Sequence, residues 1–193
     1  MGSSENNEKL ADAILAPLAA ASTAGYIGEA VSQLGHALQA ADAAHKAGAD
    51  DEAVLAALLH DIGHLVAEAD SPQMDGYGVA AHEELGAQWL HARGGSHRLC
   101  KLVASHVAAK RYLVATDPDY ATHLSEASRA TLAHQGGPLA DEEVAAMETD
   151  PDFFAVLLVR ACCDQAKDPA WRGPGLEAYR PMLVQHLLDA AQG

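Results

Sequence analysis

The sequence predicts an all-α protein: a single domain over residues 1–193, built as one bundle of eight or nine helices. Three observations favour this class. Apolar residues recur at helical rather than alternating spacing. Aromatic residues make up only 5% of the chain, whereas alanine is abundant. Residues typical of helix ends separate the periodic segments.

In the first half of the chain, glycines and polar loops separate the helices. Pro17 bends the first helix. The second stops at Gly48, the third begins after Asp50, and the fourth stops at Gly94–Gly95. We expect residues 1–7 to lie outside the folded part, as a disordered or vector-derived tail. The predicted helices cover residues 8–20, 27–46, 51–66 and 79–93.

In the second half, caps and prolines mark the helix starts. Ser96 caps the fifth helix. Asp117–Pro118 restarts the chain for the sixth, which QGGP closes. Asp150–Pro151 supplies a cap and a first-turn proline for the eighth. A short seventh helix covers DEEVAAM, and a ninth ends the chain. These predicted helices cover residues 97–113, 118–134, 141–147, 152–167 and 176–191.

The charge balance excludes several classes of partner. Twelve Lys and Arg against 27 Asp and Glu give a formal charge of −15, which repels nucleic acid and anionic membranes. No segment approaches the ~18 apolar residues of a membrane span. Three cysteines, two of them adjacent, give no disulfide framework. We therefore expect a cytoplasmic monomer or small homo-oligomer with a small-molecule partner.

Histidine is the first sign of metal chemistry, because its 11 copies nearly match the Lys and Arg together. His60 and Asp61 are adjacent in the apolar run LLHDIGH, where both need a partner if buried. A metal ion would serve both, and a hydrogen-bonded core pair is the alternative. His82 and His106 each lie in a segment rich in Ala, Val and Leu. Either alone is typical of a core histidine, but four histidines in apolar helical settings (these three and His36), together with the carboxylate next to His60, favour metal ligands.

A polar stripe precedes this run. Tyr26, Glu29, Gln33 and His36 follow one another at spacings of 3, 4 and 3, so they share a face of the predicted second helix. We expect this face to line a site, with Gln33 toward the substrate. A plain solvent face is the alternative for Glu29 and Gln33.

Cations near these residues suggest an anionic ligand. Lys110 lies four residues after His106 and hence on its face. A surface lysine is the alternative interpretation. Arg160 and Asp164 lie four apart in an apolar helix. We expect Arg160 to contact the substrate and Asp164 to be a further metal ligand. A simple ion pair between them is the alternative.

These residues resemble the HD-domain superfamily, whose pattern is a histidine, then His-Asp, then a distant aspartate. Further segments are similar to HD-domain mixed-valent diiron oxygenases of the 2-amino-1-hydroxyethylphosphonate and trimethylammonium-phosphonate group. The resemblance covers about residues 24–180. The matching segments are YIGEAVSQLGHALQ, AALLHDIGH, GYGVAAHEELGA, SHVAAKRYLV and SEASRATLAHQGGP.

The resemblance implies a site with two iron ions, active as Fe(II)/Fe(III). Asp61 would bridge them, and Tyr26 would occupy one iron before substrate arrives, with Glu29 as its hydrogen-bonded companion. The implied metal ligands are His36, His60, Asp61, His82, His106 and Asp164. The implied phosphonate contacts are His64, Lys110, Ser128 and Arg160. One departure stands out: the family has an aspartate three residues after the arginine, where this chain has Cys163. Either Asp164 or the Cys163 position corresponds to the last ligand.

The implied activity is oxidative cleavage of a C–P bond. The substrates would be O₂ and 2-amino-1-hydroxyethylphosphonate or its N-trimethyl analogue, and the products phosphate and glycine or glycine betaine. A metal-dependent HD phosphohydrolase acting on a nucleotide or small phosphoester is the alternative, because the same ligands can activate water. A non-catalytic metal-binding helical module is a third reading. Dependence on oxygen distinguishes the first two.

Overall fold

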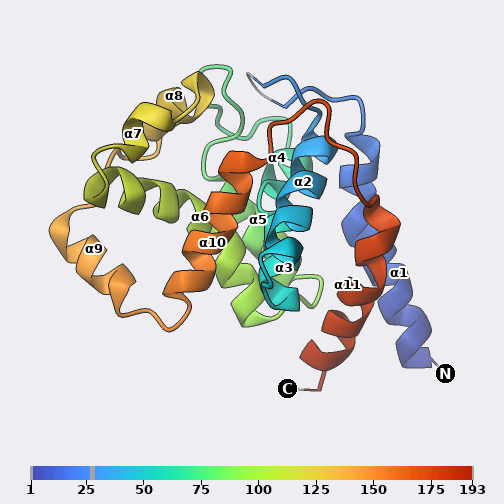
Figure 1. Ribbon diagram of the computed structural model, residues 1–193. Helices are drawn as coiled ribbons and strands as arrows, with labels where there is room; N and C mark the ends of the chain where they lie inside the picture. Colours follow the sequence, from blue (N-terminus) through green and yellow to red (C-terminus); the bar gives the residue numbers. More distant parts are fainter. Residues whose placement is uncertain (1, 27–28, 193) are drawn as a thin grey trace.

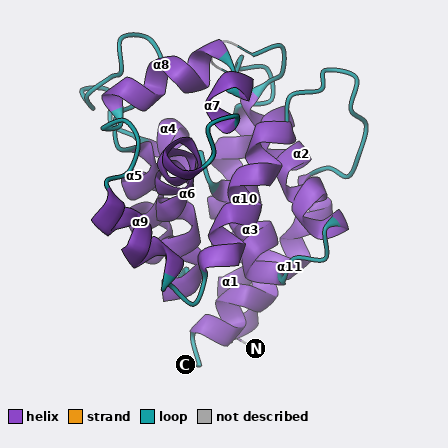
Figure 2. Cartoon of the chain, turned by 60° about the vertical axis from the view of Figure 1, so that its left-hand side comes forward, coloured by secondary structure: helices purple, strands orange, loops and turns teal. Residues whose placement is uncertain are grey.

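The computed structural model describes residues 2–26 and 29–192, and it confirms the all-α prediction. These residues form eleven helices and no strand, with only isolated bridges at Gly25–Ser32 and Gln73–Val79 (Figures 1 and 2). No helix among them is long and apolar enough to span a bilayer. The helices are α1 (Gly2–Ala20), α2 (Gln33–Lys46), α3 (Asp51–Leu59), α4 (Ile62–Val66), α5 (His82–His91), α6 (His97–Thr116), α7 (Tyr120–His123), α8 (Glu126–His134), α9 (Asp141–Glu148), α10 (Phe153–Gln165) and α11 (Leu176–Ala190).

Helix α3 forms the centre of the molecule. Every residue from 53 to 59 is buried, because this helix is apolar on all sides. Helices α2, α6, α10 and α11 pack around it. Figure 1 shows α1 beside α11 at one edge, and α7, α8 and α9 on the opposite side of the bundle. The C-terminal end of α3 therefore delivers His60 into the interior.

Two predicted helix starts are wrong by six residues each. Helix α1 begins at Gly2 rather than Glu8, so the described residues 2–7 are helical and Asn7 is buried. Helix α2 begins at Gln33, because the Ser32 side chain accepts a hydrogen bond from the Gly35 amide and caps it. Ile27 and Gly28, at the predicted start, lie outside the described residues.

The segment before α2 is a loop that folds back on itself. The Tyr26 amide donates to the Val31 carbonyl at 2.8 Å, and the Gln33 amide donates to the Ala24 carbonyl at 2.9 Å. The predicted stripe from Tyr26 to His36 therefore spans a loop and a helix instead of one helical face.

The predicted third helix is interrupted at its His-Asp pair. Helix α3 ends at Leu59, Asp61 leaves helical geometry at φ −99° and ψ 9°, and α4 starts at Ile62. Adjacent side chains on a continuous helix diverge by about 100°. The interruption allows His60 and Asp61 to face the same cavity. The predicted sixth helix is likewise divided, into α7 and α8.

Helices α4 and α5 make an unusually close approach through two glycines. A Cβ atom on Gly63 would collide with the His82 carbonyl, and one on Gly86 would lie 3.1 Å from the Gly63 amide nitrogen. Ala81, just before α5, adopts the left-handed region at φ 53°. This contact positions His82 against the turn that contains Asp61.

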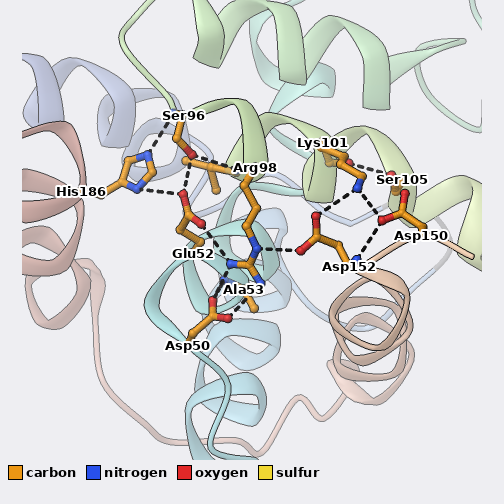
Figure 3. Close-up of polar contacts among 11 residues, drawn as sticks. Asp50, Glu52, Ala53, Ser96, Arg98, Lys101, Ser105, Asp150, Asp152 and His186 are labelled. Atoms are coloured by element: carbon orange, nitrogen blue, oxygen red, sulfur yellow. Dashed lines mark hydrogen bonds and ion pairs between the residues drawn. The ribbon is translucent and has the colours of Figure 1, made fainter. Parts of the chain in front are cut away.

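A charged network connects the far end of α3 to α6 and α10 (Figure 3). The Arg98 guanidinium donates to Asp50, Glu52 and Asp152 at 2.7–2.9 Å. Lys101 binds Asp152 at 3.0 Å and also Asp150. The network fixes three helix N-termini relative to one another, away from His60.

Candidate metal centre and its cavity

Four histidines and one aspartate converge into two groups that share Asp61. The first group is His36, His60 and Asp61, and the second is Asp61, His82 and His106. Within each group, all ligand atoms lie within 4.8 Å of one another. Asp61 Oδ2 lies 3.2 Å from His60 Nε2, and Oδ1 lies 3.3 Å from His82 Nε2. The carboxylate thus presents one oxygen to each group.

Backbone carbonyls fix the tautomer of all four rings. Because a carbonyl only accepts, each Nδ1 must carry its proton, and each Nε2 is directed inward. The Nε2 atoms lie 3.1 Å apart in the His36–His60 pair and in the His82–His106 pair. Two lone pairs at that distance repel unless a positive charge lies between them. The carbonyl contacts are His36 to Ala166 at 2.9 Å, His60 to Ala57 at 2.8 Å, His82 to Val79 at 3.3 Å and His106 to Val103 at 2.8 Å.

The electrostatics of the cluster match a cation site. Burial alone would raise the pKa of Asp61, but His60 and the other facing rings outweigh it and hold this pKa well below its ordinary value. Burial and the neighbouring rings lower the pKa of both His36 and His106 to about 3. Burial opposes protonation of His60, yet Asp61 raises its pKa well above the ordinary value. In the His36–His60 pair, the required positive charge is therefore either a proton on His60 or a metal ion.

The donor set fits a metal pair. Asp61 Oδ2 is buried and has no hydrogen-bond partner among the residues that the structure describes, which is costly unless a cation binds it. Imidazole and carboxylate ligands suit iron. The Nδ1 atom of each histidine is already oriented by a backbone carbonyl, as is usual for histidines that bind a metal through the other ring nitrogen. The described residues thus supply two metal sites with a common carboxylate.

A small cavity of about 70 Å³ opens beside the cluster. Its wall contains His60, Asp61, His82 and His106 on one side, with side chains of α6, α8 and α10 and of the loop before α5 on the others. A ligand in this cavity would contact both metal sites at once.

Val79, in the loop before α5, orients two rings. Its carbonyl accepts from His82, and its amide donates to His64 Nδ1 at 3.1 Å. The two rings stack with centroids 3.9 Å apart. Burial and His82 lower the pKa of His64 to about 4, so this ring is neutral at neutral pH and its Nε2 bears the proton. His64, which lines the cavity, therefore offers a donor to an anionic ligand.

Lys110 is a buried cation in the cavity wall. It is 3% exposed and donates to Thr131 Oγ1 at 2.9 Å and to the Ser128 carbonyl at 3.3 Å. No carboxylate in the described part of the chain forms an ion pair with it. Burial, and then the Arg160 charge, lower the pKa of Lys110 to about 7. A ligand anion would supply the missing counter-charge.

The structure does not place Asp164 with the metal ligands, contrary to our expectation. Its carboxylate binds the Arg160 guanidinium through both oxygens and accepts from the Tyr120 hydroxyl at 2.6 Å. Withdrawing Asp164 to a metal would leave the buried Arg160 unpaired, at a cost of about 3–5 kcal/mol. Arg160 itself lines the cavity. In this structure the two residues therefore form the simple ion pair.

The remaining predicted residues divide into two sets. Tyr26, Glu29 and Ser128 line the cavity, whereas Gln33 does not. Gln33 is the first residue of α2 and directly follows the N-cap residue Ser32. Tyr26 stacks on His36 at 3.9 Å, and burial and the Asp61 charge raise its pKa well above the ordinary value. The Glu29 carboxylate binds Lys167 at 2.7 Å instead of the Tyr26 hydroxyl.

Sequence reasoning missed several parts of the wall. They come from the loop before α5 and from α7 and α8, where no helical face or metal-type spacing marks them. Glycines on both sides of Tyr77 indicated a turn but not its direction. The missed residues are Met74, Tyr77, Thr131 and Gln135 in the wall and Tyr120 behind Arg160.

Comparisons with known proteins agree with this geometry. The family model described as HD domain matches residues 33–149. A (1-hydroxy-2-(trimethylamino)ethyl)phosphonate dioxygenase (glycine-betaine-forming) of Leisingera caerulea is 40% identical, over 87% of this chain and 85% of its own. A hydroxymethylphosphonate dioxygenase of Gimesia maris is 38% identical, over 80% and 77%. An uncharacterised protein of Acanthamoeba polyphaga mimivirus is 37% identical, over 86% and 76%.

Proposed function

Because this chain belongs to the HD-domain family and is similar to phosphonate dioxygenases, we propose that it is a diiron oxygenase of a small 1-hydroxyphosphonate. The substrate is 2-amino-1-hydroxyethylphosphonate, its N-trimethyl analogue or the shorter hydroxymethylphosphonate. One hydroxyphosphonate and one O₂ give one carboxylate and one phosphate. With the first two substrates the carboxylate is glycine or glycine betaine.

The observation that supports this function is the presence of two kinds of site in one cavity. Asp61 and four histidines form a paired metal site. Lys110, a short distance along α6 from His106, is a buried cation with no carboxylate partner in the described part of the chain. A phosphonate with an adjacent hydroxyl satisfies both, because its oxygens bind a metal and its negative charge binds the lysine.

Four residues of the wall have a defined task in this proposal. Lys110 and Arg160 attract and orient the phosphonate dianion, which the net charge of −15 would otherwise repel. His64 donates its Nε2 proton to a phosphonate oxygen. Tyr26, stacked on His36, covers the cluster on the side of the loop before α2. Orientation by these groups makes the encounter of substrate and O₂ effectively intramolecular.

His36, His60, Asp61, His82 and His106 would hold the two iron ions. When bound, the ions supply the redox chemistry and the coordination of O₂ that amino-acid side chains lack. The side chains of the cavity wall contribute binding and orientation.

The test is phosphate release with and without oxygen. Protein loaded anaerobically with Fe²⁺ is mixed with each of the three hydroxyphosphonates, and phosphate and O₂ consumption are measured together. We expect release only in air, with one O₂ consumed per phosphate. His97→Ala, which removes an exposed histidine outside the cavity, is the matched control for His82→Ala, which should abolish release.

The phosphohydrolase alternative makes the opposite prediction. Release of phosphate from a nucleotide or phosphoester at the same rate without air would replace the oxygenase proposal, since a metal-bound water needs no oxidant. No phosphate from any of the substrates, by protein that binds iron, would leave a metal-binding module.

A further inference from the structure

The Arg160 guanidinium is held by two side chains to which the proposed function assigns no task. Asp164, four residues later on α10, binds it through both carboxylate oxygens, and Arg160 Nε donates to Oδ2 at 3.0 Å. Tyr120, the first residue of α7, donates its hydroxyl to the same Oδ2 at 2.6 Å and accepts from Arg160 Nε at 3.1 Å. The direction of each bond is fixed, because a carboxylate only accepts and a guanidinium only donates.

These bonds occupy one edge of the guanidinium. Arginine carries five N–H groups in a planar fork, and the bonds to Asp164 and Tyr120 use Nε and Nη2. No residue in the described ranges accepts a hydrogen bond from Nη1. Since Arg160 is 7% exposed and lines the cavity, Nη1 remains for a ligand there.

The two cations of the cavity wall must be restrained, because Lys110 and Arg160 repel each other. Lys110, on α6, donates to Thr131 Oγ1 on α8 at 2.9 Å. Arg160, on α10, donates to the Tyr120 hydroxyl on α7. Each cation is thus held by a hydroxyl group from a helix other than its own. A cavity of about 70 Å³ leaves little room for either to be misplaced.

Asp164 alone cannot fix the direction of Arg160. The two side chains belong to one helix, and that of Asp164 is 25% exposed, so the pair can move together. Tyr120 adds a restraint from outside α10, because its amide donates to the Asp117 carbonyl at 3.2 Å, directly after α6. No third side chain within the described ranges bonds to Arg160 or Asp164.

We infer that Tyr120 is a positioning residue of the anion site. Its hydroxyl holds the Arg160–Asp164 pair so that Nη1 of the arginine faces the phosphonate group of the ligand. The inference rests on the proposed function for the identity of the anion, but not for the reaction with oxygen. It involves no covalent step.

The experiment compares Tyr120→Phe with the wild type as full-length, iron-loaded protein. Steady-state turnover gives KM and kcat for the hydroxyphosphonate, and anaerobic calorimetry gives the Kd of methylphosphonate, an anion without the hydroxyl group. Both KM and Kd should rise about three- to tenfold, the effect of losing one hydrogen bond. Unchanged kcat and iron content would mark a loss of binding alone, which a general loss of structure would not produce.

Two further variants show whether Tyr120 acts through Arg160. Tyr112→Phe is the matched control, because it removes a tyrosine hydroxyl that donates to Glu148 at 2.9 Å outside the cavity; it should behave as the wild type. Arg160→Met should bind methylphosphonate more weakly, through Lys110. Adding Tyr120→Phe to Arg160→Met should have no further effect, because the residue through which the tyrosine acts is absent.

The outcomes separate this inference from the proposed function. Wild-type KM and Kd in Tyr120→Phe, lost iron in that variant, or an equal loss of affinity in the Arg160→Met background would each overturn the positioning role. Wild-type protein that binds methylphosphonate without turning over any hydroxyphosphonate overturns the proposed reaction, and the Kd values then decide the role of Tyr120. Iron-loaded wild type that binds no methylphosphonate overturns both.

Discussion

Asp61 is the one residue on which both metal groups depend, because each group uses one of its oxygens. We predict that Asp61→Ala loses both ions, together with all turnover, whereas His106→Ala loses one ion. Metal content per chain after desalting, measured by atomic emission, checks this. His97→Ala should keep the wild-type content. An Asp61→Ala protein with both ions bound would contradict the shared role.

Lys110 should make phosphonate binding depend on pH. With a pKa of about 7, Lys110 is charged below pH 7 and neutral above it, so affinity for the dianion falls as the pH rises through 7. Lys110→Ala should weaken binding by about 10–100-fold, the effect of losing one charge-assisted hydrogen bond, with unchanged metal content. Anaerobic calorimetry measures the affinity.

Lys110→Arg separates the lysine from the titration of the phosphonate itself. Arginine stays protonated at every pH tested, so this variant should lose the part of the pH dependence that Lys110 contributes. An identical pH profile in Lys110→Arg and the wild type would remove Lys110 from the anion site.

At the scale of residues, the sequence predicted which histidines converge, but it did not predict the orientation of every candidate side chain. Histidine and aspartate are rare in apolar helical settings, and this singled out His60, Asp61, His82 and His106. The choice between Cys163 and Asp164 depends on the rotation of α10 about its axis. That rotation is set by packing against α2, α3 and α6, which no local pattern encodes.

Among the helices, the approach of α4 to α5 controls the position of His82. We predict that Gly63→Ala separates the two helices, because its Cβ would collide with the His82 carbonyl. Affinity at the second metal group should fall by more than affinity at the first, as sequential Co²⁺ titration would show. Gly48→Ala, at a position with open space but positive φ, should lower stability without changing metal binding. Equal effects of the two variants on metal binding would refute the prediction.

The Arg98 network should contribute stability only where its carboxylates are ionised. Hydrogen bonds from Arg98 lower the pKa of Asp50 and Asp152, so their contribution is present above the unfolded pKa and is lost as the pH falls through the folded one. Arg98→Met should therefore lower the free energy of unfolding by about 1–2 kcal/mol at pH 7. The difference should shrink below pH 4.

Urea unfolding of Arg98→Met and the wild type across pH 2–7 measures this difference. Lys9→Met removes an ion pair with Glu5 in which both side chains are about 70% exposed, and it should have no measurable effect. A destabilisation by Arg98→Met that stayed constant down to pH 2 would indicate lost packing rather than lost charge pairs.

Helix locations followed well from periodicity and caps, and Ser96 and Asp50 begin their helices as predicted. Two of the errors fell where loop hydrogen bonds or helix packing replace a continuous helix. The loop from Ala24 to Gln33 closes on its own backbone, and the break after Leu59 is stabilised by the packing of α4 on α5. Neither feature disturbs the spacing of apolar residues, so the periodicity predicts a continuous helix across both.

Across the whole molecule, the charge of −15 should make the fold sensitive to ionic strength. Self-repulsion opposes the compact state, and salt screens it, with a Debye length of about 10 Å at 0.1 M. We predict that the urea midpoint at pH 7 rises from low salt to about 0.15 M NaCl. KCl should give the same rise, because screening depends on ionic strength. A midpoint that fell with both salts would show that attractive ion pairs dominate.

The interruption between α3 and α4 has a consequence for protein engineering. If His60 and Asp61 were transplanted as neighbours onto an unbroken helical scaffold, their side chains would point about 100° apart. The imidazole and the carboxylate could then not face the same site. A designer must either copy the kink from Leu59 to Ile62 together with the side chains, or respace the two donors by a full helical turn.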